Sequence, residues 1–426
     1  MMYFLIFLMA MFGGLAVVFA LLFGPGMAFV LDGKVMFLKL LYTRLFNGMY
    51  SPPLLALPFF ILAGEIMNRC GITDRLIQFV NYLVGRVRGG LAQANIYSSL
   101  LFAGITGAAV ADVSALGSVF IPAMEKQGYT RKFSAMITAA SSIIGPIIPP
   151  SIIVVVYGAV TGVSVGSIFA ATMIPGVIVG LSMSALVAVI ARKKNFPKFE
   201  EKFQAREFCI CLKDSILALI MPLIIVGGIF SGVFTPTEAA AVAVFYALLV
   251  GVVFYRSVSI RTIYQSVFSA MRTSAMLFFI IGFANILGWI ISRVHLPEQI
   301  AVFMLSLSNN PKILLLLVVV LLIFIGTWLE TSASCIILAP ILAPVMQKVG
   351  IHPVHFATVM VVSLNIGLIT PPLGVALFAA VGVGKVSFED VVSELWPFLV
   401  LDIVVVLLLV FVPALSLAIP RVLGFI

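Results

Sequence analysis

Four short segments rich in glycine, proline and polar residues interrupt an otherwise apolar chain, and chemistry is expected there. Two are glycine-containing turns, one followed by Asp112 and the other containing Glu330. The other two carry a Pro-Pro pair, at 149–150 and at 371–372. Proline removes a backbone donor and disfavours helical geometry in the residue before it, so each pair is predicted to break a helix. Inside a bilayer, the carbonyl groups freed in this way need protein, water or an ion as a partner.

Such breaks supply the ligands that a sodium-coupled transporter needs. Carbonyl and hydroxyl oxygens at helix breaks suit Na⁺, and the N-terminal ends of half-helices favour an anion. Two turns and two breaks therefore predict two cation sites with a substrate between them. Asn365, in the second break, offers both a donor and an acceptor to a substrate, with hydrogen bonding between helices as the alternative.

The intramembrane carboxylates admit two interpretations. An isolated charge in lipid is costly, so Asp112 and Glu330 are predicted to coordinate a cation or relay a proton. The alternative is that each caps the helix that follows it. Asp402, in the last apolar span, is expected to pair with another group inside the bundle, and Glu238 is expected to cap a helix that begins at Pro236.

Composition places these segments in a membrane protein. Hydrophobic residues make up 62% of the chain and charged residues 10%, against roughly 25% charged in soluble domains. Apolar runs of about 20 residues recur along the chain, which predicts an all-α polytopic membrane protein. The net charge of +9 is interpreted as membrane topology, without nucleic-acid binding. The four cysteines have no metal-binding spacing, and ATPase, hydrolase and channel-filter motifs are absent, which predicts an ion-driven transporter and no enzyme or cofactor.

The two halves of the sequence match at a constant offset. Pro122 falls on Pro344, Gly145 falls on Gly367, and the two Pro-Pro pairs coincide. A single unmatched span between the halves would turn the second upside down, which is the inverted repeat of many secondary transporters. Most of the 25 basic residues then face one side, which the positive-inside rule makes cytoplasmic.

The expected units follow from this repeat. They are, in chain order, repeat one (1–191) with a re-entrant hairpin (91–124) and a broken helix (131–160), a cytoplasmic linker (192–211), an extra inverting span (212–231), and repeat two (232–426) with a re-entrant hairpin (313–346) and a broken helix (356–383).

Three further expectations concern the flanking segments. Phe4–Leu31 is predicted to be one continuous span. Ile72–Val87 is predicted to be an amphipathic helix in the interface, with Leu83 on its apolar face. In the second half, an interfacial stretch ending at Arg272 is predicted to precede a separate span, Ala275–Ile291.

Five segments resemble the large membrane subunit of tripartite ATP-independent periplasmic (TRAP) transporters. They are Pro122–Met124, Gly145–Ser151, Asn365–Pro372, Phe59–Glu65 and Thr235–Ala239. The resemblance implies the ion-transporter superfamily and Na⁺-driven uptake of an organic acid anion by an elevator motion. It also implies a bacterial inner-membrane location and two partners, a separate small four-helix membrane subunit and a soluble periplasmic substrate-binding protein.

The resemblance also implies site residues, carried over by position. The first sodium site would use Ala103 (through its carbonyl), Gly104, Thr106, Asp112, Gly145, Ile147 and Pro150. The second would use Gly326, Thr327, Gly367 and Thr370. The residues assigned to the substrate are Asn365, Ser142, Ser151 and Glu330.

Two alternatives stay open at this point. One is a stand-alone sodium:carboxylate symporter of the same superfamily, which needs no binding protein. The other is an intramembrane enzyme or channel, with Asp112 and Glu330 catalytic or pore-lining and with activity that needs no sodium gradient. The substrate is either sialic acid or a C4-dicarboxylate, and overall resemblance favours sialic acid.

Overall fold

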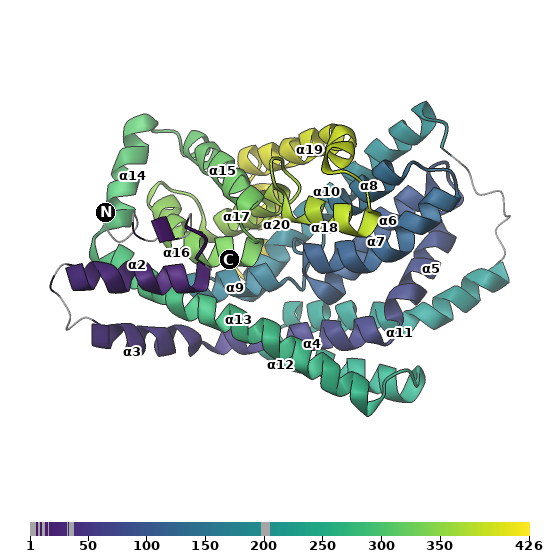
Figure 1. Ribbon diagram of the computed structural model, residues 1–426, viewed down its shortest axis with the longest axis horizontal. Coiled ribbons are helices and arrows are strands. Elements are labelled where there is room, and N and C mark those ends of the chain that lie inside the picture. Colours follow the sequence, from purple (N-terminus) through teal and green to yellow (C-terminus); the bar gives the residue numbers. More distant parts are fainter. Residues whose placement is uncertain are drawn as a thin grey trace.

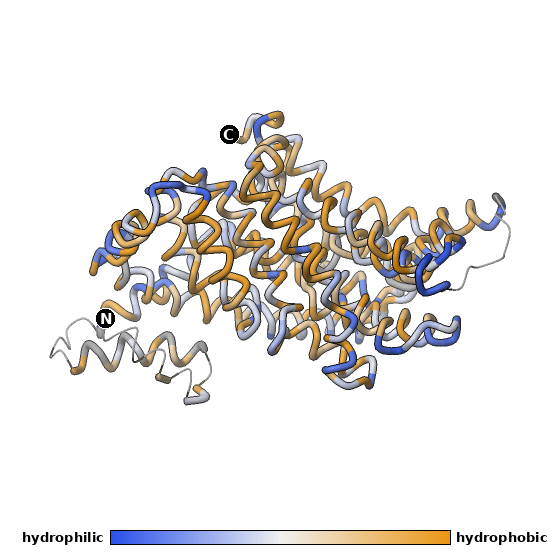
Figure 2. Tube along the Cα trace, turned by 90° about the horizontal axis from the view of Figure 1, so that it is seen from above, coloured by the Kyte–Doolittle hydropathy of each residue, from blue (hydrophilic) through white to orange (hydrophobic). Residues whose placement is uncertain are grey.

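The structure is a computed structural model that describes residues 17–31, 38–196 and 205–426, together with residues 6, 9–10, 13–15 and 33. Helices form the whole regular structure of these residues, which contain no strand. Seven helices are long and apolar enough to cross a membrane, or eight if one bent pair counts as a span. Hydrophobic residues run along most of the helices, and hydrophilic ones gather at helix ends and loops (Figure 2). The chain is therefore a multi-pass membrane protein.

Each expected hairpin is a pair of helices joined by a two-residue turn. The first consists of α6 (Gly90–Thr106) and α7 (Ala109–Lys126), and Gly107 enters the turn with a left-handed φ of 60°. The second consists of α15 (Pro311–Trp328) and α16 (Thr331–Lys348). These helices have 17 or 18 residues, longer than the half-helices that a re-entrant loop requires, so the re-entrant course of both pairs stays a prediction.

Both Pro-Pro segments interrupt a helix. The first separates α8 (Arg131–Ser142) from α9 (Ile152–Thr161), and the second separates α17 (Pro353–Gly367) from α18 (Val375–Gly384). Proline lacks the N–H that would continue the helical hydrogen bonds, so the backbone leaves helical geometry ahead of each Pro-Pro pair and returns to it afterwards.

The remaining helices complete the fold. They are α2 (Val17–Leu31), α3 (Leu38–Met49), η2 (Pro52–Leu55), α4 (Ala56–Arg69), α5 (Ile72–Val84), α10 (Val165–Lys193), α11 (Ala205–Phe230), α12 (Pro236–Leu249) with its π-helical end η3 (Val250–Phe254), α13 (Ile260–Arg293), α14 (Leu296–Leu307), α19 (Phe388–Phe411) and α20 (Ala414–Val422). In Figure 1, α3, α4, α12 and α13 form the lower edge of the molecule, and the hairpins and broken helices lie above them. Helix α4 packs against both α12 and α13, and α13 also packs against α3.

One expectation for the second half is wrong. In place of an interfacial stretch ending at Arg272 and a separate span at Ala275–Ile291, the structure has the single 34-residue helix α13. At the matching place in the first half, α3 and α4 are bent by 60° to each other. Pro52 and Pro53 stand between them, whereas the second half has no proline there to interrupt the helix.

Two other predicted boundaries change. Helices α10 and α11 extend into the expected 192–211 linker from both sides, and residues 197–204 lie outside the described part. The expected span Phe4–Leu31 is interrupted by a turn at 13–14, where Gly14 has a φ of 86°, and its remaining described helix is α2. Most of residues 1–12 lie outside the described part.

Helix α5 has the predicted apolar face, and other helices cover only part of it. Leu76, Phe79 and Val80 are buried, but Leu83 is 48% exposed. Helices α6 and α11 pack against α5, and Leu83 stands in its last turn.

Glycines let α3 and α13 approach closely. A Cβ added to Gly48 would lie 2.5 Å from Asn285 Cβ, and one added to Gly282 would lie 2.8 Å from Leu45 Cδ1. Small residues at such crossings allow tight backbone packing, which is the main source of helix association in lipid.

We therefore expect Gly282→Ala to lower the thermal unfolding temperature of the purified protein in detergent. Forcing a methyl group into a packed crossing costs about 1–3 kcal/mol. Gly227→Ala in α11 is the matched control, since a Cβ there meets no atom within 4 Å. Equal unfolding temperatures for the two variants would contradict the close crossing.

Candidate functional site

The turn of the first hairpin lies directly on the first helix break. A Cβ added to Gly107 would lie 3.0 Å from the carbonyl oxygen of Pro150 and 3.3 Å from Ser151 Cα. Gly104, in the last turn of α6, is equally close to the neighbouring span, since its Cβ would lie 2.8 Å from Pro222 Cβ. Only residues without side chains allow this approach, so the glycines of the turn bring its backbone against the Pro-Pro segment.

Asp112 joins the same place from the first turn of α7. The residue is fully buried, and its carboxylate oxygen Oδ2 occupies the space that a side chain at Gly145 would need. The positive end of the α7 dipole favours a negative charge at this position. The structure thus brings Asp112 and Gly145 together, as the assignment of both to one site requires.

The first break offers free carbonyl oxygens beside that carboxylate. Within the described part of the chain, the carbonyls of Gly145, Ile147 and Pro150 accept no hydrogen bond, whereas those of Ser141, Ser142 and Ile144 do. All of these residues are buried. A carboxylate with several free carbonyls in a buried break is a donor set that suits Na⁺.

The other predicted members of this set lie close by. Ala103 and Gly104 are in the last turn of α6, where carbonyl groups lack the donors of a following turn. Thr106 ends the same helix, but its side chain lies outside the described part.

The second hairpin and the second break meet in the same way. A Cβ added to Gly367 would lie 2.5 Å from Gly326 Cα, and one added to Gly326 would lie 2.7 Å from the carbonyl oxygen of Leu364. The backbone N–H of Gly374 donates to the Thr327 carbonyl at 3.1 Å. The two glycines are therefore in backbone contact, and the turn is hydrogen-bonded across the break.

Oxygen ligands are also present at this second contact. The hydroxyl of Thr327 donates to the Phe324 carbonyl at 2.7 Å, and that of Thr370 donates to the Ile366 carbonyl at 2.8 Å. Each hydroxyl oxygen keeps lone pairs for a cation. The Gly367 carbonyl accepts from the Thr370 N–H at 2.9 Å, which leaves it a less available ligand than predicted.

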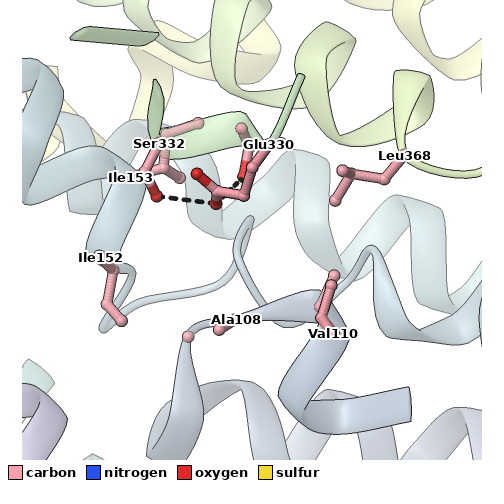
Figure 3. Close-up of a pocket in the computed structure, with 10 residues that line it drawn as sticks. Ala108, Val110, Ile152, Ile153, Glu330, Ser332 and Leu368 are labelled. Carbon is pink, nitrogen blue, oxygen red and sulfur yellow. Dashed lines mark hydrogen bonds between the residues drawn. The ribbon is translucent and has the colours of Figure 1, made fainter. Parts of the chain in front are cut away.

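A cavity of about 100 Å³ separates the two contacts. It is lined by the first turn, the start of α9, the second turn and the residue after α17 (Figure 3). The lining residues are Gly107, Ala108, Ala109, Val110, Ile152, Ile153, Glu330, Thr331, Ser332 and Leu368. Helices α7, α9 and α16 all begin at this cavity, so three positive helix ends point at one space.

Glu330 lines the cavity and caps α16. The hydroxyls of Thr331 and Ser332 donate to its carboxylate at 3.1 and 3.0 Å (Figure 3), and the backbone N–H of Ala333 donates to it at 3.0 Å. The capping interpretation is therefore confirmed for this residue. Since the side chain also faces the cavity, capping and a role toward a ligand are compatible.

The three other residues assigned to the substrate do not line this cavity. The hydroxyls of Ser142 and Ser151 donate to the backbone carbonyls of Ala139 and Pro146. The amide of Asn365 is fully buried and donates to the Val361 carbonyl at 2.8 Å. Their contact with a substrate stays a prediction.

Sequence reasoning missed several lining residues. Thr331 and Ser332, at the start of α16, are polar residues that the sequence shows directly after the second turn, but the start of α9 and the residue after α17 have no polar side chain to mark them. It also missed a buried network in which Asn95 donates to Thr138 at 2.7 Å and Ser99 donates to Ser141 at 2.9 Å, joining α6 to α8.

Of the expectations for Glu238 and Asp402, the first is confirmed and the second is wrong. Glu238 caps α12 in a reciprocal capping box with Thr235, as predicted. Asp402 does not pair inside the bundle, because neither carboxylate oxygen has a hydrogen-bond partner within the described part of the chain. That expectation is wrong, and the residues three and four positions away on the same face of α19 (Phe398, Leu399, Val405 and Val406) are all apolar.

Comparison with known proteins bears directly on this arrangement. Residues 4–415 match the family model of the tripartite ATP-independent periplasmic transporter, DctM component. The sialic acid TRAP transporter large permease protein SiaM of Vibrio cholerae is 38% identical over 411 residues, covering 96% of each chain. The C4-dicarboxylate TRAP transporter large permease protein DctM of Pseudomonas aeruginosa is also 38% identical, covering 90% of each.

A solved structure shares the fold. The YdaH transporter of Alcanivorax borkumensis superposes with a TM-score of 0.63, covering 91% of this chain and 89% of YdaH at 18% sequence identity. A likeness at this identity concerns the fold alone. The match over nearly the whole chain, with relatives above a third identical, shows that this protein belongs to the DctM-component family of TRAP transporters, as a large permease subunit.

Proposed function

We propose that this permease imports an organic acid anion by sodium-coupled symport across the bacterial inner membrane. The observation that carries the proposal is the cavity on which three helix N-termini converge, flanked on each side by a glycine contact with oxygen ligands. Positive helix ends stabilise an anion. The ten lining residues include no Lys or Arg and one carboxylate, so neutralising an anion there needs cations from elsewhere.

The two flanking contacts would supply those cations. At the first, Asp112 and the free carbonyls of the break would hold one Na⁺, and at the second, Thr327, Thr370 and the Gly326 carbonyl would hold another. Each Na⁺ would order a hairpin turn against its break, which completes the wall of the cavity. Substrate affinity and sodium affinity would therefore rise together, which is the reciprocity that coupling requires.

The substrate class follows from charge and from the relatives. A carboxylate is the group that helix N-termini favour, and the related proteins named above carry the names of sialic acid and C4-dicarboxylate transporters. We favour sialic acid, because its named relative matches the greater share of the chain. We also propose that the two halves form an inverted repeat. During transport, the hairpins and broken helices would slide as one unit past the layer of α3, α4, α12 and α13.

Two partners complete the proposed system. The family is tripartite, so a small membrane subunit and a periplasmic binding protein work with the large permease. We propose that the small subunit is a separate four-helix polypeptide, and that the binding protein delivers the anion to the outer face. The chain itself would act as a carrier and not as an enzyme.

The first experiment is uptake into proteoliposomes that contain this chain and its small subunit. Radiolabelled sialic acid or succinate is offered with and without an inward sodium gradient, and with and without the purified binding protein. We expect uptake only when both are present. Sodium-dependent uptake without the binding protein would instead indicate a stand-alone symporter, and uptake without sodium would contradict the ion sites.

We expect Asp112→Asn to raise the sodium concentration for half-maximal uptake by about tenfold or more, equivalent to at least about 1.4 kcal/mol of cation binding. The substitution keeps the shape of the side chain and removes its charge. Ser118→Ala, on an exposed face of the same helix, is the control. An unchanged sodium dependence in Asp112→Asn would remove this residue from the first site.

We expect Val110→Phe to abolish or greatly weaken uptake, because the larger ring would fill much of a cavity of about 100 Å³. Val110 is 37% exposed, so the protein has room to fold around the substitution. Val177→Phe in α10 is the matched control, at a valine that is 40% exposed and does not line the cavity. Wild-type substrate affinity in Val110→Phe would place the substrate elsewhere.

A further inference from the structure

Asp402 is a buried acid with no role in the site described above. It lies in the middle of α19 and is fully buried. Both of its carboxylate oxygens lack a hydrogen-bond partner within the described part of the chain. Buried polar groups are nearly always hydrogen-bonded, so this side chain needs an explanation.

The helix face around Asp402 is apolar. Phe398, Leu399, Val405 and Val406 stand three or four positions away, which places them on the same face of α19. All four are at most 4% exposed. The carboxyl group therefore sits in an apolar stripe that is packed against other helices and closed to solvent.

Charged groups on the surrounding helices are too far away to pair with it. Helices α8, α10, α15, α17 and α18 pack against α19 (Figure 1). The charged or titratable side chains on these five helices stand near helix ends, and α18 has none. They are Arg131 and Lys132 on α8, Arg192 and Lys193 on α10, Lys312 on α15 and His355 on α17.

The contacts of the basic side chains show how far these groups lie from Asp402. Lys132 and Lys194 pair with Glu394 near one end of α19, at 3.7 and 2.6 Å. Lys312 donates to the carbonyl of Phe411 at the other end, at 3.4 Å. At about 1.5 Å per residue, Glu394 and Phe411 lie about 12 and about 13 Å along the axis from Asp402. These cations therefore cannot neutralise it directly.

The surroundings of Asp402 favour a proton over a sodium ion as its ligand. A sodium ion needs several oxygen ligands, and the four side chains that share the helix face with Asp402 carry none. A proton needs only the carboxylate itself. Because an isolated ionised carboxylate in such a medium is strongly disfavoured against its neutral form, we propose that Asp402 is an intramembrane proton-binding site and that it holds a proton in this conformation.

The step involves one bond. A proton adds to one carboxylate oxygen, the negative charge disappears, and no other group is oxidised, reduced or cleaved. If α19 moves with the hairpins, which rests on the proposed function, protonation lets the helix change depth without carrying a charge through the membrane field. Exposure of Asp402 to water in another conformation would release the proton and tie transport to pH.

Infrared spectroscopy of the purified full-length protein in lipid nanodiscs at neutral pH tests the proton directly. We expect the difference spectrum of wild type and Asp402→Asn to show the loss of a protonated-carboxyl C=O stretch, which shifts in D₂O. Asp390→Asn, at an exposed acid that begins the same helix, is the matched control and should remove an ionised-carboxylate band instead.

A second variant covers the case in which Asp402→Asn fails to fold. Asp402→Glu keeps the acid, and it should shift the protonated-carboxyl band instead of removing it. Loss or shift of an ionised-carboxylate band in either Asp402 variant would overturn the proposal. The measurement requires neither substrate nor sodium, so its failure is distinguishable from a failure of the proposed transport function.

Discussion

The need to satisfy backbone carbonyls inside a bilayer governs this structure. Each Pro-Pro pair ends a helical ladder in the middle of a hydrophobic chain, where an unpartnered carbonyl costs several kcal/mol. In the structure a hairpin turn packs onto each break, so that the freed backbone groups face protein instead of lipid. The oxygen atoms that remain free then lie in a buried, shaped space, which is the condition for selective cation binding.

Glycine makes this packing possible at both contacts. Gly107 meets Pro150 and Ser151, Gly145 leaves room for the Asp112 carboxylate, and Gly326 meets Gly367 backbone to backbone. At each position a Cβ would displace main-chain or carboxylate atoms that have little freedom to move. The same device recurs where α3 crosses α13, so close backbone approach serves the supporting layer as well as the site.

The two sides of the central cavity are alike in backbone and different in chemistry. The first contact has a buried carboxylate and a network of Asn95, Ser99, Thr138 and Ser141 behind it. The second has threonine hydroxyls, and its acid, Glu330, is occupied in capping α16. If both contacts bind Na⁺, as we propose, their different ligand charge would give them different affinities and so an order of ion binding.

The sequence by itself determined the membrane class, the positions of the two breaks, both hairpin turns and the capping box at Glu238, because proline, glycine and capping chemistry act over a few residues. The missing proline near residue 275 could also have predicted the continuous α13. Only the tertiary structure decided which backbone meets which break, that α9 begins at the cavity, and that Asp402 has no hydrogen-bond partner among the described residues. Those facts depend on contacts between helices distant in sequence, where close packing and burial, and not local propensity, select each neighbour.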